Sequence, residues 1–171
     1  MALVLPRPVT IPTPDGSGYE LVQDYATEVL PGHRLEILGG FTFDGASIPR
    51  VFWLTTGHPM TPELQASALI HDACYCAELL PRADADGLLY HCLRIDGVGW
   101  YRSHKIWLAV RLGGGKVWAW HTPESIARSR MYCRLIALKR QCHGRGDWWG
   151  WRLLQRRIIF NLITIATPIR Q

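Results

Sequence analysis

A histidine and an aspartate stand side by side within an otherwise apolar stretch, as His71 and Asp72. Tyr75 follows four residues after the histidine, so on a helix their side chains share one face. Two more carboxylates, Asp84 and Asp86, come shortly afterwards. Burying a charge without a partner is costly, so such groups are expected either to satisfy one another or to serve a reaction.

The flanking residues predict two helices that carry these groups. Residues 61–81 are predicted to be helical, with Thr61 as the N-cap, Pro62 in the first turn and Pro81 as the end. A second helix is predicted at residues 83–95. Because the turn around Pro81 is short, this helix is expected to lie antiparallel beside the first. The sequence therefore predicts a core of two helices built around the histidine and the carboxylates.

The partner of the histidine is expected on the second helix. Consecutive residues on a helix point about 100° apart. His71 and Asp72 are therefore not expected to pair with each other, and each needs a partner of its own. Asp84 and Asp86, at the start of the second helix, are the nearest carboxylates that can reach His71.

Two interpretations of this group remain open. In the first, a carboxylate holds one ring nitrogen of His71, and the other nitrogen takes a proton from water. Asp72 then holds a hard cation such as Ca²⁺, which stabilises an oxyanion, so that the site hydrolyses an ester. In the second, a buried His–Asp–Tyr network holds the two helices in register without reacting. The spacing alone favours the structural interpretation, because structural networks perturb such groups too.

A loop with the sequence DGASIPR, residues 44–50, offers further polar groups. Asp44 and Ser47 either form a turn that binds backbone amides, or lie next to His71. Asp44 is the open candidate for a second metal ligand. Ser47 is disfavoured as a nucleophile because it lacks a G-x-S-x-G setting. Arg50 is expected to pair with an acidic group.

The cysteines do not indicate a disulfide framework or a zinc site. Their number is odd and their spacing irregular, which favours a reducing compartment and small buried side chains. They are Cys74, Cys76, Cys92, Cys133 and Cys142.

The whole chain, residues 1–171, is predicted to be one α+β domain. Residues 1–45 contain short runs rich in β-branched and aromatic residues between turn signals, which predicts a small antiparallel sheet. The helical part, residues 61–171, is expected to hold about five helices. The three that follow the His-Asp pair are predicted at residues 100–112, stopped by Gly113 to Gly115, at 122–140, and at 147–165.

Charge divides the chain into two unlike halves. Residues 1–100 hold five Lys and Arg against twelve Asp and Glu, whereas residues 101–171 hold fourteen against two. The basic, Trp-rich end predicts contact with an anionic membrane surface or with other proteins, or alternatively a helix docked on the core. Nucleic acid is disfavoured because no recognition motif accompanies the charge. No segment is expected to act as a signal peptide or a transmembrane helix.

The pattern H-D-x-x-Y followed by A-D, within residues 66–89, resembles the paired helices of phospholipase A2, especially the compact form in parvovirus capsid proteins. The resemblance implies His71 as the general base, Asp72 as a Ca²⁺ ligand, Tyr75 as a support and Asp86 as the residue that orients the histidine. The calcium loop of that family, of Y-x-G-x-G type, has no counterpart of the same spacing here.

A broader resemblance covers residues 40–115. The ordered motifs FTFDGASIPR, HDACY, ADADGLLY, DGVGW and AVRLGGG resemble a family of short phage and prophage proteins of unassigned function. The resemblance implies a shared set of polar positions, namely Asp44, Ser47, Arg50, His71, Asp72, Tyr75, Arg82 and Asp86.

The resulting expectation is a bacteriophage protein, made in the cytoplasm of the bacterial host and associated with the virion or tail. In this role it is a structural or assembly component, and its partners are other virion proteins. The alternative is a phospholipase A2-like, metal-dependent ester hydrolase with His71 as its base.

Overall fold

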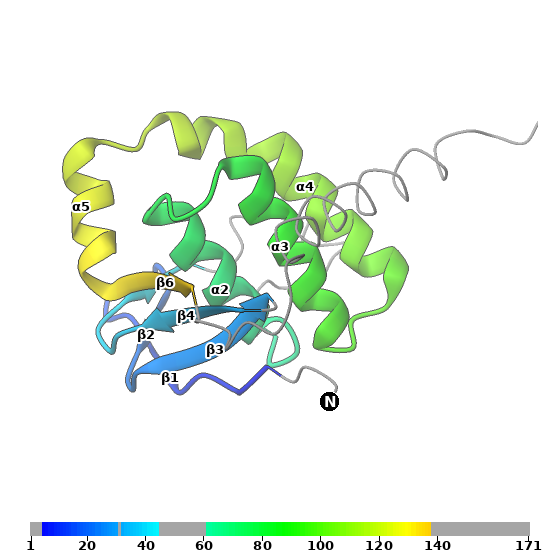
Figure 1. Ribbon diagram of the computed structural model, residues 1–171, viewed down its shortest axis with the longest axis horizontal. Coiled ribbons are helices and arrows are strands. Elements are labelled where there is room, and N and C mark those ends of the chain that lie inside the picture. Colours follow the sequence, from blue (N-terminus) through cyan, green and yellow to red (C-terminus); the bar gives the residue numbers. More distant parts are fainter. Residues whose placement is uncertain (1–4, 31, 45–60, 138–171) are drawn as a thin grey trace, which may run out of the picture. The chain divides into compact units, whose positions relative to one another are not determined.

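The computed structural model describes residues 5–30, 32–44 and 61–137 (Figure 1). In these ranges five strands come first, four helices follow, and a sixth strand ends the described chain. The predicted α+β class, with small antiparallel sheets before the helices, is confirmed. The helix predicted at 147–165 lies outside the described residues, as do Ser47 and Arg50.

The strands form two antiparallel sheets of three strands each. The first has the order β1-β2-β5 and consists of β1 (Thr10–Pro12), β2 (Tyr19–Leu21) and β5 (Thr42–Phe43). The second has the order β3-β4-β6 and consists of β3 (Tyr25–Leu30), β4 (His33–Ile37) and β6 (Cys133–Ala137). The N-terminal residues thus form parts of two sheets rather than a single one.

Alternating burial shows why β3 and β4 form a half-buried sheet. Tyr25, Thr27 and Val29 of β3 are buried, and the residues between them are exposed. Successive side chains of a strand point to opposite faces, so this pattern places one face on the core. Gly32, with a φ of 77°, supplies the left-handed backbone between the strands.

The third strand of that sheet lies within a segment predicted to be helical. Helix α5 (Pro123–Tyr132) begins as predicted, with a capping box between Thr122 and Ser125. The prediction of a helix to residue 140 is wrong for residues 133–137, which form β6 and pair with β4. Without β6, the edge of β4 would present unpaired backbone N–H and C=O groups. This long-range pairing overrides the local helical pattern.

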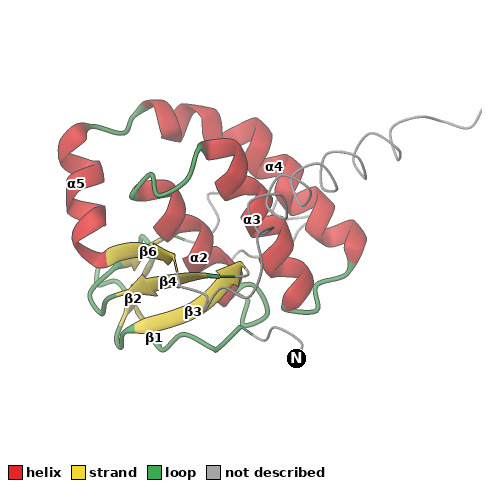
Figure 2. Cartoon of the chain, in the orientation of Figure 1, coloured by secondary structure: helices red, strands yellow, loops and turns green. Residues whose placement is uncertain are grey.

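Helix α2 (Gln65–Cys76) is the central helix, and every residue from Ala66 to Tyr75 is buried. It contacts β5, α5 and α3 (Arg82–Ile95), and α3 in turn packs against α4 (Trp100–Ala119). Figure 2 shows these helices gathered on one side of the strands. No helix of the described chain is long and apolar enough to cross a membrane.

Both ends of α2 differ from the prediction. Thr61 does not cap the helix; its carbonyl accepts from the Leu64 N–H at 2.8 Å, in a turn that precedes Gln65. The helix ends at Cys76, well before Pro81, and Glu78 then takes a φ of 45° that reverses the chain. Arg130 of α5 donates to the carbonyls of Ala77, at 2.8 Å, and of Glu78, at 3.3 Å. These bonds satisfy carbonyls that the early end leaves free.

The glycines predicted to stop α4 lie inside it. The helix continues through Gly113, Gly114 and Gly115 as far as Ala119. A Cβ on Gly114 would lie 2.9 Å from the Tyr75 hydroxyl oxygen, and that hydroxyl donates to the Gly114 carbonyl. Glycine is therefore required here because a side chain of α2 reaches the backbone of α4.

We expect Gly114→Ala to lower the free energy of unfolding by about 1–3 kcal/mol, because the new methyl group overlaps Tyr75. The matched control is Gly87→Ala in α3, where an added Cβ meets nothing within 4 Å. That change should raise stability by about 0.5–1 kcal/mol. Urea denaturation of both variants measures the difference, and equal effects would contradict the role of Gly114.

Candidate functional site

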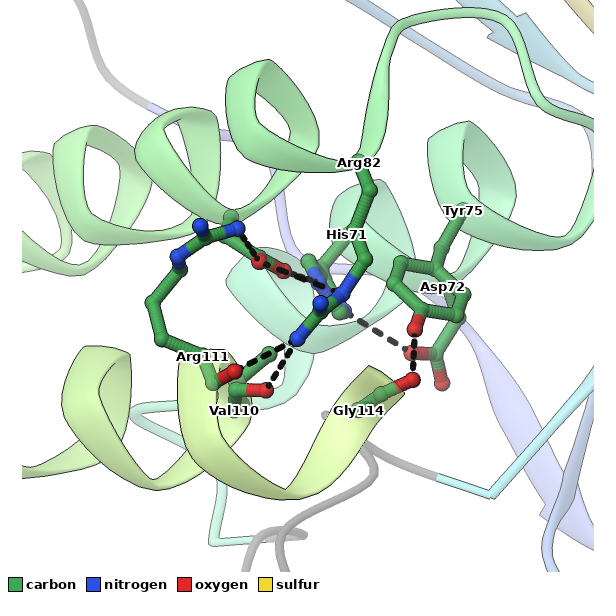
Figure 3. Close-up of polar contacts among 8 residues, drawn as sticks. His71, Asp72, Tyr75, Arg82, Val110, Arg111 and Gly114 are labelled. Atoms are coloured by element: carbon green, nitrogen blue, oxygen red, sulfur yellow. Dashed lines mark hydrogen bonds and ion pairs between the residues drawn. The ribbon is translucent and has the colours of Figure 1, made fainter. Parts of the chain in front are cut away.

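His71 is bound by two carboxylates at the centre of the helical layer (Figure 3). Its Nε2 lies 3.1 Å from Oδ1 of Asp86, and its Nδ1 lies 3.2 Å from Oδ1 of Asp72. The histidine is 0 % exposed. The predicted partner on the second helix is therefore Asp86; Asp84 lies in the first turn of α3, where a carboxylate complements the helix dipole.

The prediction that His71 and Asp72 do not pair is wrong. The angle of about 100° between neighbouring positions describes the Cα–Cβ directions on a helix. The imidazole and the carboxylate extend beyond Cβ, and rotation about their side-chain bonds brings Nδ1 and Oδ1 together. The result is a histidine with no free ring nitrogen.

Two arginines anchor the other oxygen of Asp86. Arg111 of α4 donates from Nη1 to Asp86 Oδ2 at 2.9 Å, and Arg82 Nε lies 3.9 Å from the same oxygen. Arg82 also donates from Nη2 to the carbonyl oxygens of Arg111, at 2.5 Å, and Val110, at 3.4 Å. The network thus joins α2, α3 and α4. Sequence reasoning missed Arg111, since an arginine on an amphipathic helix ordinarily faces solvent.

The surroundings keep His71 positively charged. Burial acts to lower its pKa, but the hydrogen bonds and charges of Asp72 and Asp86 outweigh burial and raise the pKa to about 9. Both ring nitrogens then donate, one to each carboxylate. An imidazolium of this kind has no lone pair with which to accept a proton from water. The open nitrogen that a general base needs is therefore missing from this geometry.

Tyr75 supports the network through packing. Its ring centroid lies 5.1 Å from that of His71 and 4.8 Å from that of Trp118, and its hydroxyl donates to Gly114. The hydroxyl binds neither His71 nor Asp86. Tyr75 therefore belongs to the group that the sequence predicted, but its polar contact ties α2 to α4. Gly114 was predicted to help end the helix, but it lies inside α4 and accepts the Tyr75 bond. The run of three glycines was the signal in the sequence that the backbone is approached closely there.

A pocket of about 280 Å³ adjoins the network on the side of Asp72. Its walls include Thr13, Asp44, Asp72 and Tyr75. The structure thus brings Asp44 to the pocket that Asp72 lines, as one of the two interpretations of the loop expected. Partial burial raises the pKa of Asp44 to about 7, and the neighbouring charge of Asp72 adds to this shift. The rest of the residue is exposed to solvent.

The described residues contain no group of three or more His, Cys, Asp and Glu side chains placed to hold a metal ion. Asp44 and Asp72 are the two predicted metal ligands, and they supply carboxylate oxygens suited to a hard cation. The four cysteines of the described chain are free thiols. Burial raises the pKa of Cys74 to about 12, which makes its thiol unreactive.

The chain belongs to a family of proteins of unknown function (DUF1353), whose model matches residues 19–110. This range includes Asp44, Arg82 and the group from His71 to Tyr75, and ends just before Arg111. The chain is also similar to the uncharacterized protein y4jT of Sinorhizobium fredii (strain NBRC 101917 / NGR234), at 31 % identity over 98 residues. This match covers 56 % of the chain and 29 % of that protein, so the chain spans less than a third of its relative. No solved structure matches the chain.

We expect the stability of the protein to fall as the pH rises from about 6.5 to about 9. A raised histidine pKa stabilises the fold fully below the unfolded-state pKa of about 6.5, and this contribution is lost as the pH rises through the folded-state value of about 9. The loss should be on the order of 3 kcal/mol. Denaturant unfolding at several pH values measures it.

His71→Gln should remove most of that pH dependence, because glutamine does not titrate. A direct readout needs no variant: nitrogen NMR at pH 7.5 should show both ring nitrogens of His71 protonated. A neutral imidazole at that pH would contradict the buried imidazolium.

Proposed function

We propose that this protein is a structural or assembly component of a bacteriophage particle, associated with the virion or tail, and that its His71 network is not catalytic. The observation that carries the second part is the complete enclosure of His71, which is 0 % exposed with both ring nitrogens bonded. The ordered motifs in residues 40–115, similar to those of phage proteins, support the first part.

The network suits a structural role because it links three helices through paired charges: His71 lies between Asp72 and Asp86, and Asp86 also binds Arg111. Removing one member of a buried ion pair leaves an uncompensated charge, which costs about 3–5 kcal/mol. Asp86 shows the arrangement most fully: it binds His71 of α2 and Arg111 of α4 while standing on α3. Such a network fixes helix register and gives a rigid body on which an assembly surface can be presented.

In this proposal the protein is synthesised in the cytoplasm of the bacterial host and is then incorporated into the phage particle. Its proposed partners are other virion proteins. The basic half, residues 101–171 with fourteen Lys and Arg against two acidic residues, also suits an anionic membrane surface.

A second candidate function is metal-dependent ester hydrolysis of the phospholipase A2 type. The bond of 3.1 Å between His71 Nε2 and Asp86 favours it, because that mechanism needs a carboxylate to orient the base. Asp72 and Asp44 would hold Ca²⁺, which polarises a substrate carbonyl when bound. His71 Nδ1 can serve as a base only if its bond to Asp72 opens and its proton leaves.

The structural proposal predicts that the protein is part of the finished particle. Mass spectrometry of purified virions of the encoding phage should find its peptides at a constant ratio to the other virion proteins. A non-structural protein encoded by the same phage provides the control for contamination. Absence from particles that are otherwise complete would overturn the proposed role.

The same proposal predicts no ester hydrolysis. Purified protein should not hydrolyse phospholipid vesicles or short-chain esters, with or without Ca²⁺. The measured rate of hydrolysis should equal that of a His71→Ala control. Calcium-dependent hydrolysis that His71→Ala abolishes would instead establish the second candidate. His71→Ala should also lower the free energy of unfolding by about 3–5 kcal/mol, since Asp72 and Asp86 lose their shared cation.

A further inference from the structure

We propose that the pocket lined by Asp44 and Asp72 binds the primary ammonium group of a small organic ligand. This inference goes beyond the structural role proposed above and does not rest on it. It assigns a ligand class to a pocket that the His71 network leaves unused.

One oxygen of the buried Asp72 carboxylate lacks a hydrogen-bond donor. The residue is 3 % exposed, and its Oδ1 is bonded to His71. Its Oδ2 is buried without any hydrogen-bond partner. A buried carboxylate oxygen without a donor is unfavourable, and native structures usually supply one. Because Asp72 lines the pocket, a ligand seated there can supply the missing donor.

The His71 bond also fixes which oxygen remains available. Asp86 holds the opposite side of the imidazole, and Arg111 holds Asp86. Because the imidazole is held in place, Asp72 bonds to it through Oδ1 and its Oδ2 stays free of His71. A donor that arrives in the pocket meets an acceptor that is already oriented, which reduces the cost of binding.

The turn between β1 and β2 contributes a further part of the pocket lining. Gly18 packs so closely on the Phe43 carbonyl that a side chain at that position would overlap it. The Gly18 N–H donates to Thr13 Oγ1 at 2.9 Å, and the Thr13 hydroxyl lies 3.2 Å from the Gly18 carbonyl. These contacts hold the turn against β5, which ends beside Asp44. The turn residues that line the pocket are therefore held in place by bonds within the turn and by packing on β5.

The composition of the walls favours an organic cation over a bare metal ion. Asp44 and Asp72 line the pocket with two carboxyl groups, and an ammonium ligand would favour the ionised form of Asp44, whose pKa is about 7. No group of three His, Cys, Asp or Glu side chains placed to hold a metal ion is present among the described residues. Phe43, Tyr75 and Val117 add aromatic and apolar surface. A cation with an alkyl chain can use both kinds of surface, and an aromatic ring attracts an ammonium group. A volume of about 280 Å³ is also far larger than an ion needs and is close to that of small-ligand sites.

The test is an NMR titration of the full-length protein with n-butylammonium chloride, followed through backbone amide signals. We expect saturable shifts among residues 13–18, 43–44 and 72–76, with affinity in the millimolar range set by so small a probe. n-Butanol, which has the same chain without the charge, should cause no saturable shift. Equal binding of butanol would overturn the proposal.

Asp44→Asn is the decisive variant because this exposed residue lies outside the His71 network, so the fold should persist. It should weaken butylammonium binding at least tenfold, roughly the loss expected for one partner of a charged contact. Glu124→Gln, which removes a carboxylate that does not line the pocket, should leave binding unchanged. Asp72→Asn should abolish butylammonium binding, provided that its amide spectrum shows a folded chain. If Asp72→Asn does not fold, the result for Asp44→Asn alone tests the proposal.

Calcium chloride in a parallel titration separates this inference from the hydrolase. Saturable shifts with Ca²⁺ and none with butylammonium would overturn the ammonium site and favour the metal site of the second candidate function. Absence of virion peptides would overturn the structural role without affecting the pocket. Failure of either proposal is therefore distinguishable from failure of the other.

Discussion

The burial of a charged histidine between two carboxylates is the constraint on which the helical part of this protein depends. Water is excluded from His71, so the cost of its charge must be met by Asp72 and Asp86 alone. Asp86 in turn carries a second oxygen that needs a donor, and Arg111 provides it. Each group therefore requires the next, and the requirement extends from α2 through α3 to α4.

This constraint also shapes the surroundings of the network. Tyr75 lies against the His71 ring, and its hydroxyl finds an acceptor in the backbone of α4 at Gly114. A Cβ at this position would lie 2.9 Å from the Tyr75 hydroxyl oxygen, so the contact suits a residue without a side chain. A glycine that would ordinarily weaken a helix interior thus serves a contact between α2 and α4.

Asp72 stands where the structural and the ligand-binding aspects of the molecule meet. One of its oxygens belongs to the network, and the other is left without a donor beside the pocket that Asp44 also lines. The same pairing that withdraws His71 Nδ1 from chemistry therefore orients a carboxylate for a ligand. The His71–Asp72 pair thus contributes both to the helix network and to the lining of the pocket.

The sequence by itself determined the class of the fold and the identity of the central residues. Short runs rich in β-branched and aromatic residues between turn signals predicted the N-terminal strands. The short connection between the two helices predicted that a carboxylate of the second helix, Asp84 or Asp86, would bind His71. These features are local, or they follow from a short connection between neighbouring helices, so residue order suffices to reveal them.

Only the tertiary structure decided the rest, because the deciding contacts join residues far apart in the chain. Residues 133–137 form β6 by pairing with β4, and the three glycines lie inside α4, where the Gly114 carbonyl accepts from Tyr75. His71 is paired with its own neighbour because side-chain rotation inside a packed core can overcome the divergence of adjacent helix positions. The same packing leaves His71 with both ring nitrogens bonded and with no exposure to solvent.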